Sequence, residues 1–123
     1  MPLEGALIAE SLRIGAVLDD LDLAVRKISR ADVGDVSAGQ PLTWTFIHFE
    51  ADEGDASRLA EALSTALDPT GGWYCDFRTG NETYVVFGGC VFRYPRGDRT
   101  RRSDAEAYAR SVGVPEAQID WPE

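Results

Sequence analysis

Residues 73–94 read WYCDFRTGNETYVVFGGCVFRY and carry the clearest structural pattern in the sequence. Aromatic and β-branched residues dominate three runs within it, which predicts strands over 73–78, 82–87 and 90–94. The connections Thr79-Gly80-Asn81 and Gly88-Gly89 predict tight turns, because glycine and asparagine tolerate positive φ. The stretch therefore predicts a three-stranded antiparallel meander.

The two turns also predict the register of the meander. If Arg78 lies opposite Glu82 and Phe87 lies opposite Cys90, one face is almost wholly apolar. That face would carry Trp73, Cys75, Phe77, Thr83, Val85, Phe87, Cys90, Phe92 and Tyr94. The other face would carry Tyr74, Asp76, Arg78, Glu82, Tyr84, Val86, Val91 and Arg93. In this register Asp76, Tyr84 and Arg93 form one cross-strand row.

A strand and a helix are predicted upstream of the meander. Residues 42–50, LTWTFIHFE, read as a strand, and both of its alternating faces are mainly apolar or neutral, as in an interior strand. Asp55 predicts the start of a helix that presents Leu59, Leu63 and Leu67 on one side and ends at Asp68.

Two further helices are predicted nearer the ends of the chain. Apolar residues spaced alternately by four and three predict a helix over 14–28, and they are Ile14, Leu18, Leu21, Val25 and Ile28. Ser103 and Glu106 match a capping box, which predicts a helix from Ser103 to a stop at Gly113.

The predicted fold is α+β, with a mostly antiparallel four-stranded sheet and the element order α-β-α-β-β-β-α. A length of 123 residues with 44% hydrophobic content fits one domain over residues 1–123. Within it, residues 1–31 would form an N-terminal helical segment and residues 42–123 the α+β core.

The composition bears on partners and location. Twelve basic and 21 acidic residues give a net charge of -9, a field that repels nucleic acids and anionic membranes and suits a basic protein partner. The sequence has no apolar run of membrane-spanning length, and Glu4 and Glu10 stand where a signal peptide would be basic, so we expect a cytoplasmic protein. Cys75 and Cys90 lie in no metal-binding or redox motif, so we expect no metal and no cofactor.

An arginine-rich run is the first candidate ligand site. Its members are Arg93, Arg96, Arg99, Arg101 and Arg102. Beside the N-terminus of the predicted Ser103 helix, these side chains could hold a phosphate or a carboxylate. The alternative is an exposed loop whose positive charges balance an acidic surface.

Two smaller constellations could carry chemistry. In the row of Asp76, Tyr84 and Arg93, the side chains could orient a polar ligand or act as acid and base if burial shifts their pKa values. The alternative is a solvent-facing row with favourable cross-strand charges.

His48 and Glu50 alternate on one strand and therefore point the same way, as a carboxylate–imidazole pair requires. The alternative for His48 is a purely structural role.

Two functions follow from these observations. The first is a small acidic binding module of the immunity, antitoxin or inhibitor kind, which masks a basic protein partner. The alternative is a small-molecule-binding protein or an enzyme that acts on an anionic metabolite, held by the cross-strand row and the arginine-rich run. We also expect a homodimer through the sheet face that carries Tyr74, Tyr84, Val86 and Val91.

Four segments resemble parts of small hypothetical proteins of high-GC bacteria. They are PLTWTFIHFE (41–50), GGWYCDF (71–77), VVFGGCVFRYPRGD (85–98) and GVPEAQIDW (113–121). The resemblance implies no fold, activity, cofactor or site residue for this chain.

Overall fold

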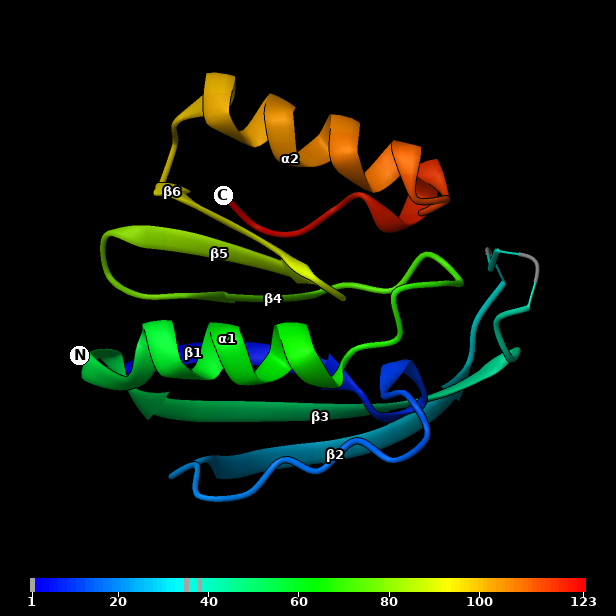
Figure 1. Cartoon of the computed structure of the whole chain (residues 1–123), viewed down its shortest axis with the longest axis horizontal. Helices are drawn as coiled ribbons and strands as arrows, with labels where there is room; N and C mark the ends of the chain where they lie inside the picture. Colours follow the sequence, from blue (N-terminus) through cyan, green and yellow to red (C-terminus); the bar gives the residue numbers. More distant parts are fainter. Residues whose placement is uncertain (1, 35, 38) are drawn as a thin grey trace.

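The computed structural model describes residues 2–34, 36–37 and 39–123, which form one six-stranded antiparallel sheet and two α-helices (Figure 1). The strands are β1 (Pro2–Ile8), β2 (Ala24–Asp32), β3 (Thr43–Asp52), β4 (Cys75–Arg78), β5 (Glu82–Phe87) and β6 (Cys90–Pro95). The helices are α1 (Ala56–Ala66) and α2 (Arg99–Ser111), and the strands lie in the order β2-β3-β1-β4-β5-β6. The α+β class is confirmed, whereas the four-stranded sheet and the order α-β-α-β-β-β-α are wrong.

The predicted helix over 14–28 is wrong, and residues 1–31 are not a helical segment. Pro2–Ile8 forms β1, and Ala24–Asp32 forms β2. Between them the backbone takes positive φ at Gly15 and Asp20, which an α-helix does not allow. Ile28, placed on the buried stripe by its spacing, is 64% exposed. Pairing of β2 with β3 therefore outweighs the helical spacing of these residues.

The N-terminal strand β1 lies in the middle of the sheet, between β3 and β4. Gly5 pairs with Phe49 on one side and with Phe77 on the other. A Cβ atom at Gly5 would lie 2.5 Å from Phe77 Cβ and 2.6 Å from the Asp76 carbonyl oxygen. Glycine at this position thus permits the close packing of β1 against β4.

Glu10 ties the turn after β1 to β3. Its carboxylate accepts a hydrogen bond from the Thr45 backbone N–H at 2.6 Å and one from the Thr45 hydroxyl at 2.8 Å. Burial raises the Glu10 pKa, but the bonds from Thr45 and the charge of Arg30 outweigh it, so the net pKa is lowered. The ionised carboxylate therefore stabilises this turn.

The strand predicted over 42–50 and the helix predicted after Asp55 are confirmed as β3 and α1. Helix α1 packs on one face of the sheet, in front of β1 in Figure 1. The core beneath it contains Leu3, Leu7, Phe49, Leu59, Leu63, Leu67, Cys75, Phe77, Tyr84 and Val86. The face expected to form a dimer does not exist as one exposed surface. Tyr84 and Val86 are 2% and 0% exposed, Tyr74 packs on the other face, and Val91 is 40% exposed. A homodimer stays a prediction.

The meander is confirmed as β4, β5 and β6, but half of its register is wrong. Phe87 pairs with Cys90 as expected, whereas Arg78 pairs with Thr83 rather than Glu82. The Thr79 backbone N–H donates a hydrogen bond to the Glu82 carbonyl oxygen at 2.9 Å, and the Thr79 hydroxyl accepts one from the Glu82 N–H at 3.0 Å, so Thr79 lies opposite Glu82 and the turn is Gly80-Asn81. This one-residue shift moves Asp76 to the face opposite Tyr84.

Helix α2 starts at Arg99, four residues before the predicted capping box at Ser103. The Asp98 side chain caps it by accepting a hydrogen bond from the Arg101 N–H at 3.1 Å. The predicted stop at Gly113 is confirmed, because the helix ends at Ser111 and Gly113 has φ +90°. The core beneath α2 contains Val85, Phe87, Tyr94, Ala105, Ala109, Val114 and Trp121.

The two helices cover opposite faces of the sheet. Strand β5 is packed on both sides, since Tyr84 and Val86 face the core under α1 while Val85 and Phe87 face the core under α2. In the part of the chain that the structure describes, no helix is long and apolar enough to cross a membrane.

Candidate functional site

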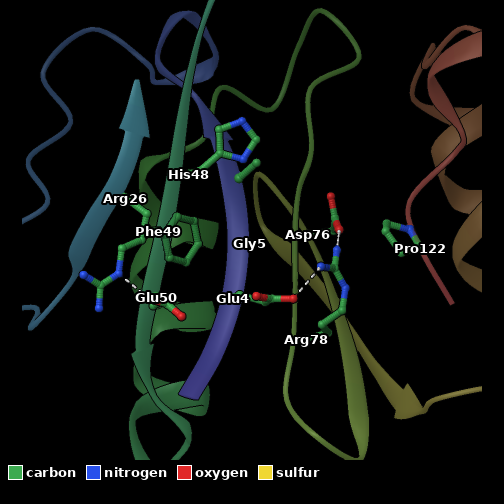
Figure 2. A pocket seen from close by; sticks show the side chains of 10 residues that line it. Glu4, Gly5, Arg26, His48, Phe49, Glu50, Asp76, Arg78 and Pro122 are labelled. Atoms are coloured by element: carbon green, nitrogen blue, oxygen red, sulfur yellow. Dashed lines mark hydrogen bonds and ion pairs between the residues drawn. The ribbon is translucent and has the colours of Figure 1, made fainter. Parts of the chain in front are cut away.

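The sheet face opposite α1 is open over β2, β3, β1 and β4, and this face carries a groove. Strand register places two rows of side chains on it. Ala6 pairs with His48 and with Asp76, while Glu4 pairs with Glu50 and with Arg78. Figure 2 shows the labelled side chains of these two rows on one side of the sheet, with Pro122 of the C-terminal segment beyond Asp76.

Three adjoining concavities form this groove. The central one, of about 520 Å³, is lined by Glu4, Gly5, Ala6, Arg26, His48, Phe49, Glu50, Asp76, Arg78 and Pro122. A second, of about 450 Å³, shares Arg26 and Glu50 with it and is lined by Pro2, Asp22, Ala24, Ala51 and Asp52 as well. A third, of about 280 Å³, shares Ala6 and Asp76 with the central one. We call the three together the open groove.

The third concavity is the aromatic end of the open groove. It is lined by Ala6, Ile8, Trp44, Phe46, Gly72, Trp73, Tyr74, Asp76, Ala117, Gln118 and Asp120. The small Ala6 side chain lies between His48 and Asp76 in their row, so the floor is low where the central concavity meets the aromatic end.

The C-terminal segment 114–123 forms one wall of the open groove. Trp121 is buried beneath α2, and its indole N–H donates a hydrogen bond to the Tyr94 hydroxyl at 2.7 Å. The Arg102 guanidinium lies 4.9 Å from the centre of the Trp121 ring. At the end of the segment, Arg96 Nε donates to the Glu123 carbonyl oxygen at 3.2 Å. These contacts hold the wall in place.

Six carboxylates line the open groove, and two arginines accompany them. The carboxylates are Glu4, Asp22, Glu50, Asp52, Asp76 and Asp120. Arg26 forms an ion pair with Glu50. Arg78 forms ion pairs with Asp76 at 2.8 Å and with Glu4 at 3.8 Å. Both guanidiniums therefore form ion pairs with groove carboxylates, although Arg78 Nε is buried with no hydrogen-bond partner among the described residues. The open groove keeps an excess of negative charge.

Two groups near the aromatic end have shifted pKa values. Burial raises the pKa of Asp76, and the neighbouring Arg78 only partly opposes this effect. Burial, together with the charges of Asp76 and Asp120, also raises the pKa of Tyr74. The Tyr74 hydroxyl donates a hydrogen bond to the Gln118 carbonyl oxygen. The free-energy cost of burying the charged Asp76 carboxylate is thus only partly offset by its contacts with the protein.

The structure brings three of the sequence-predicted site residues together. His48, Glu50 and Asp76 all line the central concavity (Figure 2). His48 and Glu50 lie on the same face of β3, as expected, and β1 lies between them and Asp76. Among the residues described, no group of three or more His, Cys, Asp or Glu is arranged to hold a metal ion.

Tyr84 and Arg93 lie on the other face of the sheet, so the predicted row with Asp76 is wrong. Tyr84 pairs with Phe77 and Arg93, whereas Asp76 pairs with Val85. The Arg93 guanidinium donates two hydrogen bonds to the Glu82 carboxylate, at 2.7 and 2.8 Å. The same guanidinium lies 5.4 Å from the centre of the Tyr84 ring.

Three more arginines of the run form ion pairs within the chain, and Arg96 donates hydrogen bonds to the Thr79 and Glu123 carbonyl oxygens. Arg99 contacts Glu123 at 3.3 Å, Arg101 contacts Asp98 at 3.9 Å and Arg102 contacts Glu106 at 3.2 Å. Three of these residues, Arg99, Arg101 and Arg102, belong to α2 rather than to a loop.

Sequence reasoning missed most of the open groove. Sequence reasoning did not identify the following lining residues as site residues: Glu4, Asp22, Arg26, Trp44, Phe46, Asp52, Trp73, Arg78 and Asp120. The pairing of β1 with β3 and β4 and the pairing of β2 with β3 gather them, and no local pattern in the sequence predicts these pairings.

No protein-family model, no curated protein and no solved structure matches this chain.

Proposed function

We propose that this protein is an acidic binding module that masks a basic surface of a protein partner, in the cytoplasm, through the open groove. The observation that carries the proposal is the set of six carboxylates on one concave face whose only arginines, among the described lining residues, are already paired. Such a surface attracts a basic partner and steers its approach. The net charge of -9 adds to that attraction.

The alternative, a protein that acts on an anionic metabolite, has less support. It depended on Asp76, Tyr84 and Arg93 in one row and on free arginines near α2. Asp76 lies on the opposite face. Arg93, Arg99, Arg101 and Arg102 contact carboxylates of the chain itself, and Arg96 donates to backbone carbonyl oxygens. An anion at the open groove would meet mainly carboxylates.

The test compares two charge-reversed variants that carry the same change in net charge. Asp22→Lys/Asp52→Lys reverses two groove carboxylates that form no ion pair with any described residue. Asp19→Lys/Glu61→Lys reverses two exposed carboxylates outside the groove. Each immobilised protein captures partners from an extract of the native host, and the captured protein is then purified and its affinity measured by calorimetry at several salt concentrations.

The proposal predicts a stoichiometric basic partner that binds wild type and the Asp19/Glu61 variant equally. The Asp22/Asp52 variant should bind it at least about tenfold more weakly, since close charge pairs at interfaces couple by about 1.5 kcal/mol or more. Affinity should also fall as salt rises. Failure to capture any stoichiometric partner, or equal weakening by both variants, would refute the proposal.

A further inference from the structure

We propose that the aromatic end of the open groove binds the guanidinium group of an arginine side chain from the partner. This inference deepens the proposed function and rests on it. It adds a specific recognition element to a surface that otherwise attracts its partner by net charge.

The first support is an array of aromatic rings. The Trp44 and Trp73 ring centres lie 5.2 Å apart with their planes inclined by 52°. The Phe46 ring lies 6.0 Å from Trp44 at an inclination of 51°. All three side chains line the aromatic end, as does Tyr74. Trp44 and Trp73 are only 6% and 7% exposed, so they form a fixed wall, and the partly exposed rings of Phe46 and Tyr74 offer most of the aromatic surface to a ligand. The π faces of such rings attract cations.

The second support is the pair of carboxylates at the same place. Asp76 and Asp120 both line the aromatic end, and the described lining contains no lysine or arginine. Asp76 already receives one hydrogen bond, from Arg78 Nη2 at 2.8 Å. The polar contact of Asp120 is with the Tyr74 hydroxyl, at 3.4 Å. A cation that entered here would meet rings and carboxylates.

The burial of Asp76 also favours a cation at the aromatic end. Its side chain is 18% exposed, and its raised pKa reflects a desolvation that Arg78 does not fully offset. A second cation beside this carboxylate would stabilise its ionised form. A positively charged ligand should therefore bind more favourably at the aromatic end than at an exposed acidic patch, because it stabilises a buried carboxylate.

Shape favours arginine over lysine. A guanidinium is planar, stacks on aromatic rings and donates several hydrogen bonds in a fixed fork, whereas an ammonium is a compact and strongly hydrated charge. Two carboxylates beside inclined rings suit the planar group. The volume of about 280 Å³ suits a side chain rather than a folded element.

The experiment uses the whole chain and small probes. Nα-acetyl-arginine amide is titrated into the labelled protein, and backbone and tryptophan indole N–H signals are followed by two-dimensional NMR. Nα-acetyl-citrulline amide is the neutral control of nearly the same shape, and the lysine amide tests the preference for guanidinium. Free arginine tests a metabolite source, because its own carboxylate would meet Asp76 and Asp120.

The expected result is millimolar binding of the arginine amide, with shifts at Trp44 and Trp73, weaker binding of the lysine amide and of free arginine, and none of citrulline. Asp120→Asn should weaken the arginine amide about tenfold, because a hydrogen bond to a charged group contributes about 1.5–3 kcal/mol. Asp120 is exposed, so this variant should fold. Glu61→Gln, outside the groove, is the matched control and should leave the affinity unchanged.

Three results would overturn the inference. They are equal binding of arginine and citrulline amides, shifts confined to residues outside the aromatic end, and unchanged affinity in Asp120→Asn. Tighter binding of free arginine than of the amide would replace the partner's side chain with a metabolite as the source of the cation.

The two proposals can fail separately. A captured basic partner that needs Asp22 and Asp52 but binds Asp120→Asn as tightly as wild type would remove the arginine site and leave the proposed function standing. Binding of the arginine amide without any protein partner would remove the proposed function and leave the cation site.

Discussion

Replacement of Gly5 by alanine should destabilise the protein, because β1 has no room for a Cβ atom on its α1 side. The added atom would lie 2.5 Å from Phe77 Cβ, 2.6 Å from the Asp76 carbonyl oxygen and 3.0 Å from Phe49 Cζ. The first two are atoms of β4 that no side-chain rotation can move. Strands β1 and β4 must therefore separate, at the place where β4 joins the rest of the sheet.

The magnitude follows from two opposing effects. Overpacking of a dense core costs about 1–3 kcal/mol, and the rigid neighbours here place Gly5→Ala near the upper value. Alanine also reduces the conformational entropy of the unfolded chain, which returns about 0.4–1 kcal/mol. The net loss should be about 2 kcal/mol. For a chain of this size that loss lowers the melting temperature by roughly 8 °C.

The assay is thermal and chemical unfolding followed by circular dichroism. Gly34→Ala is the matched control, since a Cβ there would meet nothing within 4 Å and its melting temperature should not fall. A Gly5→Ala protein that melts within about 1 °C of wild type would refute the close approach of β1 and β4 described above.

Two further predictions concern stability. Glu10→Gln should destabilise the protein by about 1–2 kcal/mol at pH 7. The folded pKa of Glu10 lies below its unfolded value, so stability from this carboxylate is present above the unfolded pKa and disappears as pH falls through the folded one. Urea unfolding at pH 7 and pH 3 should show the difference between wild type and variant shrink at the lower pH. Phe87→Ala should lower the free energy of unfolding by about 3–5 kcal/mol. Phe92→Ala should lower it less, because the Phe92 ring is only half-buried. A larger loss for Phe92→Ala in the same unfolding assay would contradict the placement of Phe87 in the core under α2.

The meander, β3 and α1 could be predicted because their signals are local. Turn residues and apolar periods are read over a few neighbouring positions. The β4–β5 register could not be predicted, since β5 is buried on both faces and either register gives an apolar surface.

The N-terminal strands could not be predicted for a different reason. Strand β1 pairs with β3 and β4, which come more than 30 residues later in the chain, and its sequence PLEGALI contains a glycine that lowers strand propensity. The apolar spacing of Val25 and Ile28 also fits a helix. Without β1, the sequence could place His48 and Glu50 on one face but could not bring Asp76 beside them.

The unequal coverage of the sheet has a consequence for motion. Strand β5 is clamped between the cores under α1 and α2, whereas β2 is an edge strand with mostly exposed residues and a bulge between Val25 and Lys27. Strands with few buried contacts open and bend at lower free energy than strands inside a core. The compliant part of the open groove is therefore its β2 edge, which can bend while β3, β1 and β4 are held by the core beneath α1.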